Sequence, residues 1–462
     1  MGRNVIELKG KNVGVLGFGV EGLSVVEWLL NQDCRVSVFD EQPGQKFDAG
    51  LVSLLRAREV QFFFGPFPDL AVFEVLVRSP GVPLSHRRLK QAQQRQVRVT
   101  TLSNLFFERC PCPIIGITGT KGKGTTATLI FEILKAAGRD AYLGGNIGTP
   151  GLDFLDELDA DSLVVLELSS FQLMDIESSP QIAVVLMVTS EHLDYHESHN
   201  EYVTSKAGIV KFQPPSDAVV VNVDYENSLK IVRSAMSRRL EVSTKKNLRA
   251  GCFLDGDAVV TVFNGQRQEV VAINQVKLLG RHNLENVCAA VGVAKLLNVA
   301  NNEIAQTIRT FRGLPHRLQL VAEISGVKYV NDSYSTTPET AMAAIQAFPN
   351  TPKILILGGS SKRSDFAELG KILASDEFVK AIIGIGQEWP RIKAAVGKLP
   401  AAVEMVEDCR TMQEIVQQAR KRAKRGDVVL FSPACASFDM FKSYKDRGEQ
   451  FMTEVLRRSK KA

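Results

Sequence analysis

The chain has 462 residues, 45% hydrophobic and 23% charged, which is typical of a soluble globular protein with roughly two to four domains. The net charge of +5 suits an anionic small molecule, and without a basic arm it does not indicate nucleic acid. The seven cysteines are scattered, which indicates reduced thiols. Because no signal-peptide core and no run of about 18 apolar residues occurs, we expect a cytoplasmic protein without a membrane span.

The N-terminal segment has a pattern typical of dinucleotide binding. An apolar strand at residues 13–16 leads into the turn Gly17-Phe18-Gly19-Val20-Glu21-Gly22, and a second strand ends at Asp40. A further strand at residues 75–77 leads into Arg78-Ser79-Pro80-Gly81, at a strand end where open α/β sheets bind ligands. Taken alone, this segment would also allow a nicotinamide oxidoreductase.

Strands alternate with helices along the whole chain, which favours three consecutive α/β domains. We place them at residues 1–109, 110–312 and 313–462. The predicted fold is a Rossmann-like N-terminal domain, a central P-loop mononucleotide-binding domain and a C-terminal Rossmann-like domain. Within residues 252–278 we expect short strands that form a meander.

A glycine-rich loop between a strand at residues 114–118 and a helix predicts a phosphate site. Its sequence is Gly119-Thr120-Lys121-Gly122-Lys123-Gly124-Thr125-Thr126. Glycines allow several N–H groups to converge on phosphate oxygens, and Lys123 would add a full positive charge. Gly124 stands where a hydroxyl residue normally binds Mg²⁺, so Thr125, Thr126 or a water takes that role. A turn with two surface lysines is the plainer alternative.

Two polar positions follow neighbouring apolar strands of the central segment. Glu167 ends the strand at residues 163–166, where a buried carboxylate needs a partner or a metal ion. His192 follows the next strand and is the first of three histidines, which also suggests zinc. No cysteine lies near, and a P-loop favours Mg²⁺.

Lys206 lies on an expected helix across residues 202–208, with Asn200 as its N-cap. Its local sequence is that of an ordinary surface lysine. A functional role for Lys206 therefore needs information from beyond its neighbours.

These motifs together resemble the Mur ligase family, in the family's order and over essentially the whole chain. Besides the glycine loop and the His192 stretch, the matching motifs are Glu167-Leu168-Ser169-Ser170-Phe171-Gln172-Leu173, Gly280-Arg281-His282-Asn283, Leu314-Pro315-His316-Arg317, Asn331-Asp332-Ser333 and residues 432–442. The last stretch is similar to the branch that adds glutamate.

The resemblance implies an ATP- and Mg²⁺-dependent, amide-bond-forming ligase of peptidoglycan precursor synthesis. We expect a monomer, since no assembly motif argues against one. Its expected substrates are UDP-N-acetylmuramoyl-L-alanine and glutamate, with D-glutamate preferred, joined through an acyl phosphate. Tyr334 stands where the D-glutamate-adding members usually carry lysine, and a related group that adds L-glutamate is similar here. A sister ligase that adds L-glutamate or another amino acid is therefore the alternative. A non-catalytic relative would lack one of the main catalytic positions, and none is missing.

The resemblance also implies roles for individual residues. The catalytic positions are Lys123, Lys206, His192 and Glu167. The expected Mg²⁺ ligands are Thr125, Glu167, His192 and Lys206, with Lys206 carrying a carbamate. Beyond the glycine loop, the nucleotide contacts are Asn283, Arg317 and Asp332.

The remaining implied residues bind the other two substrates. The UDP moiety contacts Val20, Glu21, Asp40, Ser79 and Gly81. Asn146 contacts the muramoyl peptide. The incoming glutamate contacts Thr336, Lys362, Ser437 and Tyr444.

Overall fold

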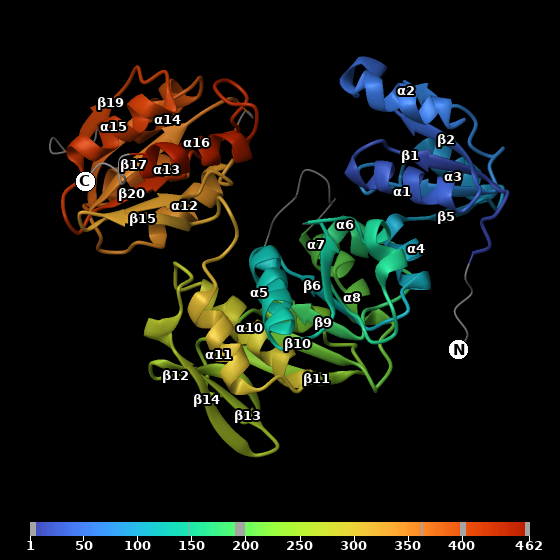
Figure 1. Ribbon diagram of the computed structural model, residues 1–462, viewed down its shortest axis with the longest axis horizontal. Helices are drawn as coiled ribbons and strands as arrows, with labels where there is room; N and C mark the ends of the chain where they lie inside the picture. Colours follow the sequence, from blue (N-terminus) through green and yellow to red (C-terminus); the bar gives the residue numbers. More distant parts are fainter. Residues whose placement is uncertain (1–5, 147, 190–198, 362–363, 398–402, 458–462) are drawn as a thin grey trace. The chain divides into compact units, whose positions relative to one another are not determined.

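The computed structural model describes residues 6–146, 148–189, 199–361, 364–397 and 403–457, so the predicted positions His192 and Lys362 lie outside the described residues. Three sheets with flanking helices confirm the predicted three-part α/β fold (Figure 1). The chain forms two compact units, Met1–Ile273 with Glu285–Ile308 and Asn274–Leu284 with Arg309–Ala462. Within the described residues, no helix combines the length and apolar character needed to cross a membrane.

The first sheet is parallel, with strand order β3-β2-β1-β4-β5. Its strands are β1 (Asn12–Leu16), β2 (Arg35–Asp40), β3 (Gln61–Phe64), β4 (Val75–Arg78) and β5 (Arg98–Thr100). Its helices are α1 (Val20–Asn31), η1 (Gly44–Lys46), α2 (Ala49–Ala57), α3 (Arg87–Gln94) and α4 (Leu102–Arg109). The strand order reverses between β1 and β4, so the loops after these strands meet at a switch point, where such sheets bind ligands.

The second sheet has the order β14-β13-β12-β11-β10-β9-β6-β8-β7. Its strands are β6 (Ile114–Thr118), β7 (Ala141–Gly145), β8 (Leu163–Glu167), β9 (Ile182–Val185), β10 (Ala218–Asn222), β11 (Arg238–Ser243), β12 (Gly251–Asp255), β13 (Ala258–Phe263) and β14 (Gln266–Ala272). The last three form the predicted antiparallel meander. Strand β6 is buried along its length and lies between β8 and β9, so the glycine loop leaves the middle of the sheet.

The helices of this region lie between its strands or after them in the chain. They are α5 (Lys123–Ala136), η2 (Gly151–Glu157), α6 (Ser170–Leu173), α7 (His199–Ser205), α8 (Gly208–Lys211), α9 (Glu226–Ile231), η3 (Ile273–Gln275), α10 (Asn283–Leu296) and α11 (Asn301–Thr310). In Figure 1, α5 lies beside β6, the strand that precedes the glycine loop.

The expected helix around Lys206 was wrong in its limits. Helix α7 starts before Asn200, so Asn200 is not its cap, and it ends at Ser205. Lys206 lies in a turn before α8, with its N–H donating to Val203 O at 3.2 Å. The turn brings the backbone of Gly208 so close to Leu173 that a Cβ at Gly208 would overlap the Leu173 carbonyl oxygen. Packing against α6 therefore overrides a continuous helix.

The third sheet has the order β15-β16-β20-β17-β18-β19. Its strands are β15 (Gln319–Ile324), β16 (Val327–Asn331), β17 (Lys353–Gly358), β18 (Val379–Ile385), β19 (Glu404–Val406) and β20 (Val428–Phe431). Its helices are α12 (Pro338–Gln346), α13 (Ala367–Ser375), α14 (Trp389–Val396), α15 (Met412–Arg422) and α16 (Tyr444–Leu456). All strand pairs are parallel except β15 with β16, so the remaining strands end at one edge.

Asp332 follows β16 directly, and its side chain connects several loops at this edge of the sheet by hydrogen bonds. Its Oδ1 accepts the Leu318 N–H at 2.9 Å, and its Oδ2 accepts hydroxyl hydrogen bonds from Ser432 at 2.7 Å and from Ser335. The side chain is almost completely buried, and this burial raises the pKa of Asp332 to about 6, although the hydrogen bonds act in the opposite direction. The carboxyl group therefore binds its proton more tightly in the folded chain than in an unfolded one.

This shift predicts a pH-dependent contribution to stability. An unfolded Asp has a pKa of about 3.9, so between about pH 4 and 6 the folded state binds more protons, and stability falls as pH rises. The free energy of unfolding of the parent chain, minus that of Asp332→Asn, should fall by about 2 kcal/mol between pH 4.5 and 7.5. Urea unfolding would be followed by Trp389 fluorescence in a Trp28→Phe background. A difference that stays constant over this range would contradict the assignment.

Candidate active site

The glycine loop has the geometry of a phosphate-binding turn. It joins the buried strand β6 to helix α5, and Gly122 caps that helix with φ +88°. A side chain at Gly122 would overlap the Asn286 amide, so both the backbone conformation and the space require glycine. The first N–H groups of a long helix consequently face the loop, which is a favourable place for an anion.

Two lysine ammonium groups converge on one carbonyl oxygen of this loop. Lys123 Nζ donates to Gly119 O at 3.1 Å and to Thr120 O at 3.0 Å. Lys206 Nζ donates to the same Gly119 O at 3.3 Å, lies 4.5 Å from the Tyr202 ring centroid, and its residue is 1% exposed. Two positive charges beside a turn of N–H groups suit a polyanion such as a triphosphate.

Thr120 uses its hydroxyl to hold the loop in place. Its N–H donates to Met187 O at 2.7 Å, and its Oγ1 donates to Thr189 O at 3.1 Å and accepts the Thr189 N–H at 3.0 Å. The Tyr202 hydroxyl lies 3.1 Å from the same Oγ1. The predicted phosphate residue thus also anchors the loop to the segment that leads towards His192.

Gly124 has no side-chain hydroxyl, but the next two residues in the first turn of α5, Thr125 and Thr126, each carry one. Thr125 is 4% exposed and Thr126 is fully buried. Thr126 Oγ1 is buried without a hydrogen-bond partner among the described residues. Both predicted hydroxyls therefore sit within the helix start, and Thr125 remains the proposed metal ligand.

Glu167 and Asn146 are brought together at the ends of β8 and β7. Asn146 Nδ2 donates to Glu167 Oε1 at 2.9 Å, and the Asn146 N–H donates to Glu167 O at 2.9 Å. Glu167 is 5% exposed and, among the described residues, makes no ion pair. The described part of the chain holds no group of three His, Cys, Asp or Glu side chains that could bind a metal ion. A single buried carboxylate fits Mg²⁺, which takes few protein ligands beside phosphates and water.

The predicted UDP residues lie around two turns at the switch point of the first sheet. Asp40 Oδ2 accepts the Phe18 N–H at 2.8 Å, so Asp40 shapes the glycine turn. Glu21 Oε1 accepts a hydrogen bond from Gln172 Nε2 at 2.6 Å, and burial raises the pKa of Glu21. Val20 is 75% exposed, a large apolar side chain open to contact. Ser79 and Gly81 lie in the second turn.

The predicted third-domain residues cluster at the carboxyl edge of their sheet. The Arg317 guanidinium lies 4.2 Å from the Tyr334 ring centroid, and Tyr334 meets Tyr444 edge-on at 5.3 Å. Asp332 lies beside them, and burial of the His316 ring lowers the pKa of His316. The predicted nucleotide residue Arg317 thus lies next to an aromatic pair that includes the predicted glutamate residue Tyr444.

The loop that carries Ser437 is tied to the loop after β17. Ser360 N–H donates to Ala436 O at 2.9 Å, and Ser360 Oγ accepts the Phe438 N–H at 3.0 Å. Ser437 is 2% exposed. Thr336 lies just before α12, and Asn283 Nδ2 donates to Leu279 O at 2.6 Å.

The sequence interpretation missed Arg447, which organises this edge. Its guanidinium is fully buried and donates to Ser333 Oγ and O at 2.9 Å and to the carbonyls of Cys435 and Ala436 at 3.1 Å. Burial lowers the pKa of Arg447 to about 10. Arg447 lies in the first turn of α16 beside other charged residues, so its neighbours in the sequence did not indicate that its side chain would be buried.

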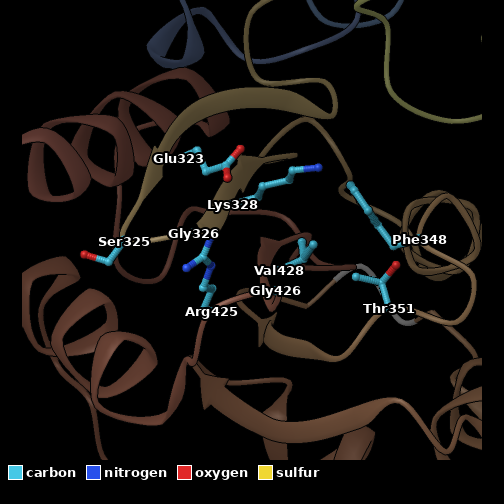
Figure 2. Close-up of a pocket in the computed structure, with 9 residues that line it drawn as sticks. All are labelled: Glu323, Ser325, Gly326, Lys328, Phe348, Thr351, Arg425, Gly426 and Val428. Carbon is cyan, nitrogen blue, oxygen red and sulfur yellow. The ribbon is translucent and has the colours of Figure 1, made fainter. Parts of the chain in front are cut away.

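The third domain also has a hollow of about 680 Å³, which lies away from the predicted site residues (Figure 2). It is lined by Glu323, Ser325, Gly326, Lys328, Phe348, Thr351, Arg425, Gly426 and Val428. Lys328 and Val428 lie at the amino ends of β16 and β20, whereas Asp332 follows the carboxyl end of β16. The hollow therefore contains none of the predicted site residues.

The sequence matches three family models in succession. They are the Mur ligase MurD-like N-terminal domain at residues 11–101, the Mur ligase middle domain at residues 117–294, and the Mur ligase, glutamate ligase domain at residues 316–435. Solved structures are similar in fold, including MurF from Acinetobacter baumannii, with a TM-score of 0.61, 17% identity and 91% of each chain covered. MurF ligase from Thermotoga maritima in complex with ADP has a TM-score of 0.57 and 19% identity, covering 99% of this chain and 97% of that chain.

Full-length relatives are more similar in sequence. The UDP-N-acetylmuramoylalanine--D-glutamate ligase of Pelotomaculum thermopropionicum is 37% identical, over 96% of this chain and 97% of that protein. The protein of the same name from Thermoanaerobacter sp. is 36% identical, over 97% and 99% respectively. With models matched in all three regions and such relatives along nearly its whole length, the chain belongs to the Mur ligase family.

Proposed function

We propose that the protein is an ATP-dependent ligase that joins D-glutamate to UDP-N-acetylmuramoyl-L-alanine in peptidoglycan precursor synthesis. The observation that carries the proposal is the convergence of Lys123 and Lys206 on the carbonyl of Gly119 in a P-loop. The names of the full-length relatives supply the substrates. An oxidoreductase would have no use for this loop.

The reaction has two steps. The alanine carboxylate of the nucleotide substrate attacks the γ-phosphorus of ATP, the bond to the β-phosphate oxygen breaks, and ADP and an acyl phosphate form. The glutamate amine then attacks the acyl carbon, loses a proton, and phosphate leaves. Lys123 and the loop N–H groups stabilise the charge on the transferring phosphoryl group. Excluding water protects the acyl phosphate from hydrolysis.

Mg²⁺ would be held by Glu167, Thr125 and His192, with Lys206 contributing as a carbamate. When bound, it would neutralise phosphate charge and align the phosphoryl group for transfer. The buried Glu167 carboxylate, with the neutral Asn146 amide as its partner, supports this assignment. Carbamylation would turn the Lys206 ammonium into an anion, which suits a metal-side role better than the cation does.

The amino-acid site is proposed at the carboxyl edge of the third sheet. Thr336, Lys362, Ser437 and Tyr444 would bind glutamate, and Asn283, Arg317 and Asp332 would contact the nucleotide. Tyr334 replaces a lysine that D-glutamate-adding members usually carry, which keeps a sister ligase that adds L-glutamate or another amino acid as the second candidate. The Arg317 guanidinium lies against the Tyr334 ring, so a cation lies next to the position where lysine is usually found. We place the reaction in the cytoplasm, where ATP is available, and expect a monomer.

The product assay tests the proposal directly. Purified protein would be incubated with ATP, Mg²⁺, UDP-N-acetylmuramoyl-L-alanine and either D- or L-glutamate, with phosphate release and product mass measured. We expect product only with D-glutamate and one phosphate per product. Product with L-glutamate alone would identify the sister activity, and ATP turnover that yields no amide product with either would refute the ligase proposal.

Substitution of Lys123 tests the phosphate loop. Because Lys123→Ala removes a positive charge from the site of phosphoryl transfer, turnover should fall at least about 10²-fold. Lys135→Ala is a matched control, since Lys135 lies in the last turn of the same helix and is exposed. Steady-state phosphate release measures both variants. Near-parental turnover of Lys123→Ala at saturating ATP would contradict the loop assignment.

A further inference from the structure

Arg78 is the last residue of β4 and is fully buried. It precedes a loop that is proposed to bind a nucleotide. It is 1% exposed, although arginine is rarely buried without partners. A cation at this position suggests a direct contact with the pyrophosphate of the substrate. Its hydrogen bonds point to a different role.

The Arg78 guanidinium donates hydrogen bonds to backbone carbonyls of the following loop and to the carboxylate of Asp175. Nη1 donates to the carbonyl oxygens of Val82 at 2.7 Å, Ser79 at 3.3 Å and Pro80 at 3.5 Å. Nε and Nη2 donate to Asp175 Oδ2 at 3.2 and 2.7 Å. Asp175 neutralises the charge, and the loop carbonyls occupy the donors, so little of Arg78 remains for a phosphate.

The loop that Arg78 shapes is locked to the glycine turn of the same sheet. Ser79 N–H donates to Leu16 O at 2.9 Å, and Ser79 Oγ donates to Gly17 O at 3.2 Å. Gly17 has φ +91°, and a Cβ there would approach Ser79 Cβ to 3.0 Å. A shift of the loop after β4 would therefore displace the glycine turn as well.

Asp175 is itself held within the same compact unit. Asn104 Nδ2 donates to Asp175 O at 3.0 Å, and Asn104 Oδ1 accepts the Glu177 N–H at 2.9 Å. The neighbouring Gln172 donates to Glu21 of the glycine turn. Both nucleotide turns are thereby connected to the segment that follows Glu167, from the central region of the chain.

We propose that Arg78 is a positioning residue that fixes the turns around Ser79 and Gly81 for a uridine-nucleotide-linked substrate through its ion pair with Asp175. This inference rests on the proposed function of those turns. Arg78 shapes the backbone and does not touch the substrate. The direct-contact alternative makes opposite predictions for Asp175, because removing an anion beside a phosphate would strengthen binding.

The decisive variant is Asp175→Asn. Positioning predicts that the KM for UDP-N-acetylmuramoyl-L-alanine rises about tenfold, with kcat at saturation and the KM for ATP close to parental values. Arg78→Lys should raise the same KM by a similar factor, because one ammonium cannot hold both Asp175 and the loop. The double variant should then be no worse than the worse single variant. A KM that falls or stays unchanged in Asp175→Asn would overturn the proposal.

Comparing Arg78→Gln with Arg78→Lys shows whether substrate binding needs only the positive charge at this position or also the hydrogen-bonding shape of the guanidinium. If Arg78→Lys binds substrate like the parent chain while Arg78→Gln does not, charge alone matters and the proposal fails. Arg95→Gln is the matched control, since Arg95 forms an exposed ion pair with Asp69 in the same region, and it should leave both KM values unchanged. If circular dichroism shows that Arg78→Gln does not fold, the KM values of Arg78→Lys and Asp175→Asn still test the proposal.

Calorimetric titration with UDP separates this inference from the proposed function. Absence of UDP binding to the parent chain would refute the nucleotide role of the turns, and the positioning role with it. UDP binding to the parent chain that is weakened in Asp175→Asn supports the positioning role. Equal binding to both would overturn the role of Arg78 and leave the proposed function intact.

Discussion

The carbonyl oxygen of Gly119 receives two lysine ammonium groups, and the rest of the proposed chemistry depends on this convergence. Lys123 reaches it from the helix that follows the loop, whereas Lys206 arrives from a turn between α7 and α8. Each lysine brings a positive charge to the loop, and a phosphate held by the loop N–H groups would lie beside both. The proposed function places the triphosphate of ATP here and a carbamate on Lys206.

The surrounding contacts keep this arrangement rigid. Thr120 and Tyr202 fix the loop from two sides, and Gly122 allows the helix to start where phosphate oxygens would lie. In the third domain, Asp332 and Arg447 perform comparable roles, because each bonds to loops from more than one strand. Polar groups with several partners hold functional loops more firmly than exposed ion pairs can.

Much of the fold and the centre of the site could be predicted because their signals are local. The glycine loop lies between a strand and a helix, and Glu167 ends an apolar strand, so neighbours in the sequence define both. Lys206 shows no such signal: its burial depends on chain segments far apart, and only the family resemblance assigned it a role. The error at the end of the helix around Lys206 has the same origin, since packing of Gly208 against Leu173 ends the helix early. Arg78 and Arg447 could not be interpreted from sequence because each depends on a partner far away in the chain, Asp175 for Arg78 and Ser333 for Arg447.

The central claim is that the loop at Gly119 delivers the terminal phosphoryl group of ATP to a substrate carboxylate. It is tested most directly with UDP-N-acetylmuramoyl-L-alanine whose alanine carboxylate carries ¹⁸O, incubated with ATP, Mg²⁺ and D-glutamate. The isotope shift in the ³¹P spectrum of the released phosphate reports where the oxygen goes. Formation of an acyl phosphate predicts one ¹⁸O in each phosphate released. Product that forms while the phosphate contains no ¹⁸O would contradict the account.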